Sequence, residues 1–265
     1  MIETLQSLVL GILQGLTEFL PISSSGHLVL GEHFFKITPD LSFNILLHVA
    51  TLFAVLVFFR KTCFKIVLSL KTRDSYFHLF ILIIIASIPT AFIGFLGKSY
   101  VESFMENSSF TAVALVVNGL LLISSTCFLH KLTTSQFATP PSLHLSKKTI
   151  LIVLLIGVAQ GIAIIPGISR SGSTIITALF LGFSGGEAFL FSFLLSIPAI
   201  IGAFLFECSH FSLKTLSPSL AVGFVSAFIC GLFSIYIVRA SLIRGFFPFF
   251  GYYCLIIGVA ALFFL

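Results

Sequence analysis

Long apolar blocks restrict the fold of this chain more than any other feature of its sequence. A transmembrane helix needs about 20 predominantly apolar residues. Six blocks approach or reach that length: 42–59, 77–96, 109–129, 188–206, 218–238 and 245–265. The blocks are continuous, unlike the short alternating segments of a membrane barrel. Only 9% of the residues are charged, whereas a soluble domain carries about 25%. The sequence therefore predicts an all-α polytopic membrane protein.

Two further apolar stretches, at about 5–31 and 149–181, are interrupted near their middle. The interruptions are PISSSGH (Pro21–His27) and PGISRSGST (Pro166–Thr174), which are rich in Pro, Gly and Ser. Such clusters end a helix. Non-helical backbone survives at membrane depth only where protein or a wet cavity surrounds it. We therefore expect two re-entrant helical hairpins.

Basic residues gather in three connectors, as the positive-inside rule predicts for cytoplasmic loops. They are Arg60, Lys61, Lys65, Lys71 and Arg73, then Lys131, Lys147 and Lys148, then Arg239 and Arg244. The opposite loops set glutamates beside their lysines: Glu102 and Glu106 near Lys98, and Glu207 near Lys214. Both termini are then expected outside. The same placement of charge argues against nucleic acid as a partner. The first residues lack the basic start of a secretory signal, so we expect them in the mature chain.

A short internal repeat relates the two interrupted stretches. Setting Gly157 over Gly11, an offset of 157 − 11 = 146, aligns them without a gap. Gly11, Gln14, Gly15, Ile22, Ser23, Ser25 and Gly26 then meet Gly157, Gln160, Gly161, Ile168, Ser169, Ser171 and Gly172.

This repeat predicts one membrane domain, 1–265, made of two similar halves. The first repeat covers 1–129, a cytoplasmic connector covers 130–148, and the second repeat covers 149–265. Each half is a re-entrant hairpin followed by three spans. Because three is odd, the second half must be inverted in the membrane. Inverted repeats with broken helices place their polar site near the bilayer midplane, at the repeat interface.

Three ionisable residues lie in or beside the two breaks: Glu18, His27 and Arg170. An ionisable group at membrane depth is expensive and is by default a functional candidate. Gln14 and Glu18 are four residues apart, so they share a helix face. This pair can bind a divalent cation, order a nucleophilic water or hold a substrate hydroxyl. It can also be a polar contact between helices.

The serines after Pro21 have two interpretations. Ser24 and His27 are three residues apart, which lets a hydroxyl and its base meet on a new helical turn. Ser23, Ser24 and Ser25 can equally cap the helix that follows. The place of His27 in the break, opposite an arginine, favours function. The other histidines are dispersed, mostly near loops, and no functional role is predicted for them: His48, His78, His130, His144 and His210.

The segment PGISRSGST is the most specific part of the sequence. Arg170 offers a planar donor fork suited to phosphate oxygens. Gly167 and Gly172 allow tight turns, and a helix that begins here would point its free N–H groups at the same anion. Hydroxyl groups flank the arginine, from Ser169, Ser171, Ser173 and Thr174. The alternative is an Arg170 that only neutralises Glu18, but such a pair would not need the glycines and hydroxyls.

The motifs QGLTEFLPISSSGH (Gln14–His27) and PGISRSGST closely resemble the two signatures of the undecaprenyl pyrophosphate phosphatase family. These are bacterial membrane enzymes also known as bacitracin-resistance proteins. The resemblance covers essentially the whole chain in length, span number and motif spacing. The better-known members carry Glu at the position of Gln14. This chain therefore has one carboxylate at that pair where they have two.

The resemblance implies hydrolysis of undecaprenyl pyrophosphate to undecaprenyl phosphate and inorganic phosphate. That reaction recycles the lipid carrier for peptidoglycan synthesis and gives bacitracin resistance. The family's pocket opens to the outer face of the bacterial plasma membrane and uses a divalent cation, Mg²⁺ or Ca²⁺, which is expected here at Glu18 and Gln14. By motif position the catalytic residues are Ser24, His27, Glu18 and Arg170. The expected substrate and phosphate contacts are Gln14, Ser23, Ser25, Gly167, Ser169, Ser171 and Thr174.

Several alternatives stay open at the level of sequence. The nucleophile is Ser24, with His27 as base or acid, or it is His27 itself, or a water that His27 activates. A secondary transporter is the main rival function, since inverted repeats and broken helices are typical of that class. A phosphatase that also moves the lipid carrier across the bilayer combines the two. The sequence leaves a homodimer and the preferred polyprenyl length undetermined.

Overall fold

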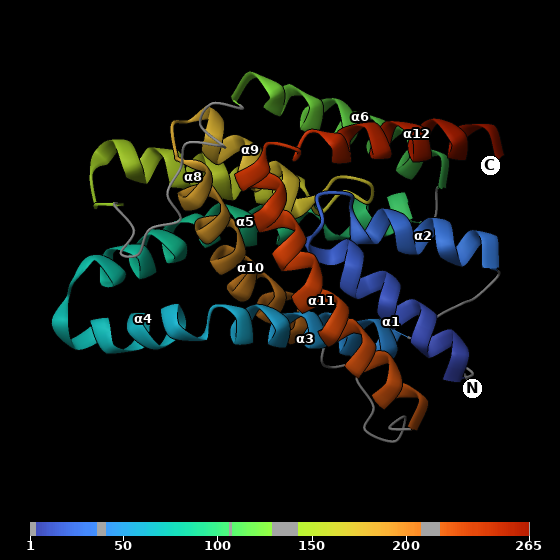
Figure 1. Cartoon of the computed structure of the whole chain (residues 1–265), viewed down its shortest axis with the longest axis horizontal. Coiled ribbons are helices and arrows are strands. Elements are labelled where there is room, and N and C mark those ends of the chain that lie inside the picture. Colours follow the sequence, from blue (N-terminus) through green and yellow to red (C-terminus); the bar gives the residue numbers. More distant parts are fainter. Residues whose placement is uncertain (1–3, 36–40, 106–107, 129–142, 208–217, 265) are drawn as a thin grey trace.

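The computed structural model describes residues 4–35, 41–105, 108–128, 143–207 and 218–264, and these parts are helical without a strand (Figure 1). The helices of the first half are α1 (Thr4–Phe19), α2 (Ser24–Phe35), α3 (Leu41–Phe58), α4 (Arg60–Thr72), α5 (Ser75–Met105), α6 (Ser108–Ser124) and the 3₁₀ turn η1 (Ser125–Phe128). Those of the second half are α8 (Lys147–Ile162), α9 (Arg170–Phe180), α10 (Gly185–Glu207), α11 (Pro218–Arg244) and α12 (Phe249–Phe264). The chain is all-α, as predicted.

The first predicted hairpin is the pair α1 and α2, separated by residues 20–23. Pro21 lies in this break, where a proline ends an α-helix because it lacks an N–H and its ring clashes with the preceding turn. Ser23 has φ 70°, a left-handed conformation that turns the chain into α2. Its Oγ then accepts the N–H of Gly26 at 3.2 Å, as a capping serine does.

The second predicted hairpin is the pair α8 and α9, separated by residues 163–169. Gly167 has φ 98°, a conformation that glycine adopts without steric cost. Ser169 is the N-cap of α9 and accepts the N–H of Gly172 at 3.2 Å. Ser169 and Gly172 are the repeat partners of Ser23 and Gly26, so the two breaks end in the same cap.

In the described part of the chain, four helices are long and apolar enough to cross a membrane, over Ser75–Gly97, Ser108–Cys127, Gly185–Phe206 and Pro218–Arg244. A fifth span is counted if α3 and α4 are taken as one element, although they are bent by 76° at Phe59. The predicted span 245–265 corresponds to α12, a shorter apolar helix. Within the described ranges, four of the six expected spans are thus met by length and composition, α12 is a shorter apolar helix, and α3 is one arm of the bent pair.

Close helix pairs join the two halves. α1 packs on α11, α8 packs on α5, and α6 packs on α12, the last pair running side by side (Figure 1). Glycines permit the first two contacts: a Cβ on Gly11 would lie 2.4 Å from the carbonyl oxygen of Gly223, and one on Gly157 would lie 2.0 Å from that of Ala86. Small residues spaced by four are typical of close membrane helix pairs. The inversion of one half relative to the other stays a prediction.

The basic helical segments lie toward one end of the long axis of the molecule. α4, with its cluster of basic residues, and the start of α8 lie toward one end, whereas the start of α1 and the end of α12 lie toward the other (Figure 1). The residues predicted to balance charge on the opposite side fall where side chains or backbone lie outside the described part of the chain: Lys98, Glu102, Glu106, Glu207 and Lys214. Lys131 lies outside it as well.

Candidate active site

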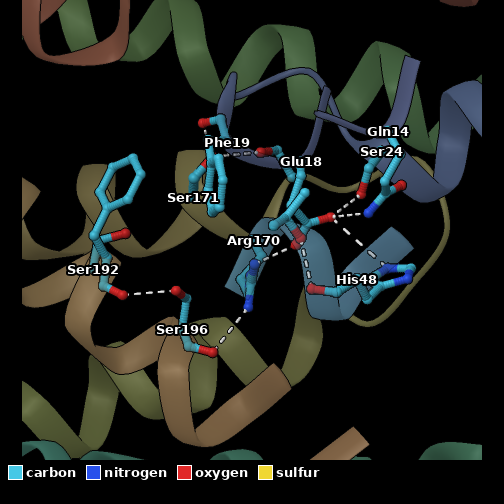
Figure 2. A network of polar contacts seen from close by, with 12 residues as sticks. Gln14, Glu18, Phe19, Ser24, His48, Arg170, Ser171, Ser192 and Ser196 are labelled. Atoms are coloured by element: carbon cyan, nitrogen blue, oxygen red, sulfur yellow. Dashed lines mark hydrogen bonds and ion pairs between the residues drawn. The ribbon is translucent and has the colours of Figure 1, made fainter. Parts of the chain in front are cut away.

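The carboxylate of Glu18 is the centre of a buried polar cluster between the two breaks. Its side chain is 6% exposed, and Arg170 donates from Nη2 to Oε1 in an ion pair. The Oε2 atom accepts the Gln14 amide at 2.9 Å and the Ser24 hydroxyl at 2.7 Å. Figure 2 shows these side chains pointing toward the carboxylate from α1, α2 and α9. The contact between the regions of the two breaks thus brings together four predicted site residues.

Arg170 begins α9 and reaches across to α1. Besides the ion pair with Glu18, its Nη1 donates to the backbone oxygen of Ser196 on α10, 3.4 Å away. Its side chain is 19% exposed. The contact that the sequence offered as an alternative, Arg170 neutralising Glu18, is therefore present. The phosphate-binding role of Arg170 stays a prediction.

Ser23 joins the two breaks directly. Its Oγ accepts the backbone N–H of Gly167 at 3.2 Å, in addition to the capping contact with Gly26. Ser25 is 3.3 Å from the same oxygen. A Cβ on Gly26 would be 3.0 Å from the Cα of Gly167, so the two loops touch along their backbones. Ser23 thereby fixes the position of one motif relative to the other.

The remaining predicted hydroxyls of the second motif are buried and bonded to protein groups. Ser169 lies 3.2 Å from Ser171, whose Oγ donates to the backbone oxygen of Phe19 at 2.9 Å. Thr174 contacts the Arg170 carbonyl at 2.9 Å and the Ser192 hydroxyl at 2.6 Å. The Ser171 bond joins the start of α9 to the end of α1, and the Thr174–Ser192 contact joins α9 to α10.

Asn118 of α6 is a site residue that the sequence reasoning missed. Its Nδ2 donates to the Pro21 oxygen at 3.0 Å, and its Oδ1 accepts the Ser169 N–H at 2.9 Å. One fully buried amide thus holds both breaks. The available signal was an amide inside the apolar block 109–129, since polar side chains at membrane depth commonly bond between helices.

His27 does not bond Ser24 in this structure. Its Nδ1 is 2.8 Å from the backbone oxygen of Ser23, and its Nε2 is 2.9 Å from the hydroxyl of Tyr253 on α12. The two rings stack with centroids 5.6 Å apart. Because a carbonyl only accepts, Nδ1 carries the hydrogen and Nε2 accepts from the tyrosine. The expected pair of Ser24 with His27 is replaced by a pair of Ser24 with Glu18.

His48 of α3, for which no role was predicted, lies beside the cluster. Its Nε2 is 3.8 Å from Glu18 Oε2, and its Nδ1 is 2.9 Å from the backbone oxygen of Asn44. Its side chain is 42% exposed, so it lies between the buried carboxylate and the surroundings (Figure 2). The signal that marks it is the one applied to Glu18: an ionisable side chain inside an apolar block.

The expected divalent cation can be tested against the donor atoms. The described residues contain no group of three or more His, Cys, Asp or Glu side chains that could hold a metal. Gln14 is fully buried, yet its Oε1 has no hydrogen-bond partner. That oxygen and the Glu18 carboxylate are the hard ligands that Mg²⁺ and Ca²⁺ prefer. Since Mg²⁺ is commonly held by one or two carboxylates together with substrate phosphates, Gln14 and Glu18 fit such an ion only as part of a substrate complex.

Comparison with known proteins shows similarity over nearly the whole chain. The family model of the bacitracin resistance protein BacA matches residues 7–260. An undecaprenyl-diphosphatase of Methanococcus maripaludis is 36% identical, over 98% of this chain and 100% of its own length. Proteins of the same name from Desulforapulum autotrophicum and Syntrophotalea carbinolica are 39% and 41% identical, over 98% and 96% of both chains. With its apolar helices, the chain is a multi-pass membrane protein, and it belongs to the BacA family of bacitracin resistance proteins.

Proposed function

We propose that this chain is a polyprenyl diphosphate phosphatase that hydrolyses undecaprenyl pyrophosphate to undecaprenyl phosphate and inorganic phosphate. The relatives named undecaprenyl-diphosphatase support the substrate, since they match over nearly their full length. The reaction recycles the lipid carrier for peptidoglycan synthesis and gives bacitracin resistance.

One observation carries this proposal: a buried carboxylate holds a serine hydroxyl on one side and an arginine on the other. Ser24 donates to Glu18 Oε2 at 2.7 Å, while Arg170 pairs with Oε1. Phosphoryl transfer to an enzyme hydroxyl requires a nucleophile, a base and a positively charged side chain that binds the phosphate. Ser24, Glu18 and Arg170 can supply these three groups. A contact that served packing alone would not need the hydroxyl.

Substrate binding begins with the exchange of partners at Arg170. The terminal phosphate presents several anionic oxygens and takes the guanidinium from Glu18, because Arg–phosphate pairs are charge-assisted and often bidentate. The N-terminus of α9, where Arg170 is the first residue, favours the same anion. Glu18, released from Arg170, keeps the Ser24 hydroxyl as a hydrogen-bond donor at 2.7 Å.

The first chemical step forms a bond between Ser24 Oγ and the terminal phosphorus. The Ser24 proton passes to Glu18 Oε2, and the bond from phosphorus to the bridging oxygen breaks. Undecaprenyl phosphate leaves with the electron pair of that bond, and phosphoserine remains. Arg170 stabilises the charge on the transferring oxygens. In the alternative role of this pair, Gln14 and Glu18 would hold a divalent cation that supplies charge neutralisation on the diphosphate, and Glu18 would then not take the Ser24 proton.

The second step is hydrolysis of the phosphoserine by water. Water attacks phosphorus, its proton passes to a base, and Ser24 Oγ leaves with a proton returned by Glu18. His27 is the candidate base, and its Nε2 lone pair must then exchange the Tyr253 hydroxyl for the water. Direct attack by His27, or by a water it activates, is the alternative to the phosphoserine. The present bonds of its two ring nitrogens favour Ser24.

The proposed site opens to the outer face of the plasma membrane, and both termini lie outside. The cluster of basic residues in α4 and the lysines at the start of α8 support this orientation, because they lie toward the end of the molecule opposite the start of α1 and the end of α12 (Figure 1).

Phosphate release from undecaprenyl pyrophosphate by the purified protein in detergent tests the function. Arg170→Ala should lower the rate by at least about a hundredfold, the scale of losing one charge-stabilising group. Chelator should lower the wild-type rate if the cation takes part. Ser24→Ala should abolish a phosphoprotein that acid quench traps in the wild type. Full activity of Ser24→Ala would exclude the serine nucleophile, and no release with any cation would leave a transporter, which needs no hydrolysis.

A further inference from the structure

Helix α4 leaves the direction of the preceding helix sharply. The described part of α3, Phe43–Phe58, and α4, Arg60–Thr72, meet at 76°. If the apolar α3 crosses the bilayer, α4 runs close to the membrane plane. The left-handed residue Arg73, with φ 51°, then ends α4 by donating its N–H to the Ser69 oxygen. α4 is therefore a separate helix and not a continuation of α3.

The two faces of α4 are reversed relative to a helix on a water-soluble protein. Its protein-facing side buries the small polar residues Thr62 and Ser69. Its outward side exposes Phe64, Val67 and Leu68 by 64%, 62% and 51%. These three are spaced i, i+3, i+4, so they form one face. Large apolar side chains turned outward indicate that the medium beyond them is apolar.

The charge of α4 keeps it out of the hydrocarbon core. The helix carries Arg60, Lys61, Lys65 and Lys71 and no acidic residue. Lys65 is held by Tyr76, with Nζ 3.3 Å from the hydroxyl and 5.2 Å from the ring centre. Lys61 and Lys71 are exposed. Arg60 and Lys71 continue the apolar face at its two ends, four residues before Phe64 and four residues after Val67. An apolar face with basic residues at its ends fits a helix that lies in the headgroup region.

We propose that α4 is an interfacial helix that binds anionic phospholipid headgroups. The apolar face of Phe64, Val67 and Leu68 enters the upper acyl region, and Lys61 and Lys71 contact the lipid phosphates. Charge complementarity selects the occupant, because the basic side chains have no acidic partner on α4 and anionic leaflets attract such segments. This surface is independent of the proposed hydrolysis, and its test uses no substrate.

A single tryptophan can report on this surface, since the chain contains none. Phe64→Trp places the reporter on α4. Phe233→Trp on α11 is a matched control, because Phe233 is 61% exposed and belongs to an apolar part of its helix. Each variant is reconstituted into vesicles of phosphatidylcholine that contain acyl-brominated phosphatidylglycerol or acyl-brominated phosphatidylcholine at equal mole fraction. Bromine quenches the fluorescence of a tryptophan in contact with that lipid.

We expect the brominated phosphatidylglycerol to quench the Phe64→Trp variant more strongly, with an apparent preference of roughly fivefold per contacting lysine at low salt. The preference should fall with added NaCl and in Lys61→Gln/Lys71→Gln. The Phe233→Trp control should be quenched equally by both lipids. Equal quenching at Phe64→Trp would overturn the proposal, and so would the absence of quenching, which would mean that protein covers this face. Leu68→Trp repeats the measurement if Phe64→Trp fails to fold.

Discussion

Removal of Arg170 alone should cost more stability than removal of Arg170 together with the charge of Glu18. The two side chains are 19% and 6% exposed, so neither charge is fully solvated. In Arg170→Ala the carboxylate keeps the neutral donors Gln14 and Ser24, and His48 Nε2 lies farther away, at 3.8 Å. An uncompensated buried charge costs about 3–5 kcal/mol. We expect that decrease in the free energy of unfolding for Arg170→Ala.

Adding Glu18→Gln to Arg170→Ala removes the buried charge that the single variant leaves unpaired. The double variant should therefore recover about 2–3 kcal/mol, the upper part of the range for coupling between residues in direct contact. Unfolding of the purified protein by SDS titration in mixed micelles, followed by helical circular dichroism, measures both values. Lys148→Ala, an exposed charge at the start of α8, is the control and should change stability by less than about 1 kcal/mol.

The comparison of Arg170→Ala with the double variant also separates an effect on stability from an effect on catalysis. In the proposed mechanism the double variant stays inactive although it is more stable than Arg170→Ala, because Arg170 and Glu18 both act in the reaction. A double variant no more stable than Arg170→Ala would refute the reasoning that the ion pair compensates a buried charge. Recovery of phosphate release along with stability would show instead that the pair serves the fold alone.

Three further outcomes follow from contacts around the site. Ser23→Ala removes the acceptor of the Gly26 and Gly167 N–H groups and should lower the free energy of unfolding by about 1–3 kcal/mol, whereas Ser25→Ala, measured by the same SDS titration, should lower it less. Gly157→Ala should destabilise the α8–α5 contact, because its Cβ would lie 2.0 Å from the Ala86 oxygen. The control Gly202→Ala, whose Cβ would have nothing within 4 Å, should be neutral or stabilise the protein by up to about 1 kcal/mol. Equal effects of the two substitutions on the free energy of unfolding would contradict the close approach of α8 to α5. Gln14→Glu adds a second carboxylate beside Glu18 and should raise the affinity for Mn²⁺ in the absence of substrate, as measured by electron paramagnetic resonance, and an unchanged affinity would show that this position does not face a cation.

The two breaks and the helical class follow from local chemistry. Pro21 and Gly167 do not continue a helix, so the positions of the two breaks could be predicted without tertiary contacts. The approach of Glu18 to Arg170 was also predictable, because the repeat relates the two breaks and buried charges need partners. The bend between α3 and α4 was harder to predict. The block 42–59 has the length of a span, but the 76° bend after it depends on how α4 packs.

The missed residues have partners that only the packing of distant helices supplies. Asn118 bonds to residues 97 and 51 positions away in the chain, and Tyr253 reaches His27 across 226 positions. No local pattern encodes such distances. The contact of His48 with Glu18 is also long-range. His48 differs from the other missed residues because the sequence alone shows an ionisable side chain inside an apolar block. The rule that marks an ionisable group inside an apolar block applies to His48 as it does to Glu18.

The sequence left two interpretations of Arg170, charge neutralisation and anion binding, and in the proposed mechanism one requires the other. Arg170 and Glu18 come from the two breaks, and their contact holds the guanidinium at the place where the phosphate must bind. The phosphate can take the arginine only if Glu18 gives it up, and Glu18 is then a carboxylate in a buried site without its counterion. Its nearest proton donor is the Ser24 hydroxyl, 2.7 Å away. In the proposed mechanism, binding of the substrate therefore frees Glu18 to take the Ser24 proton, whereas the resting ion pair keeps the carboxylate engaged with Arg170.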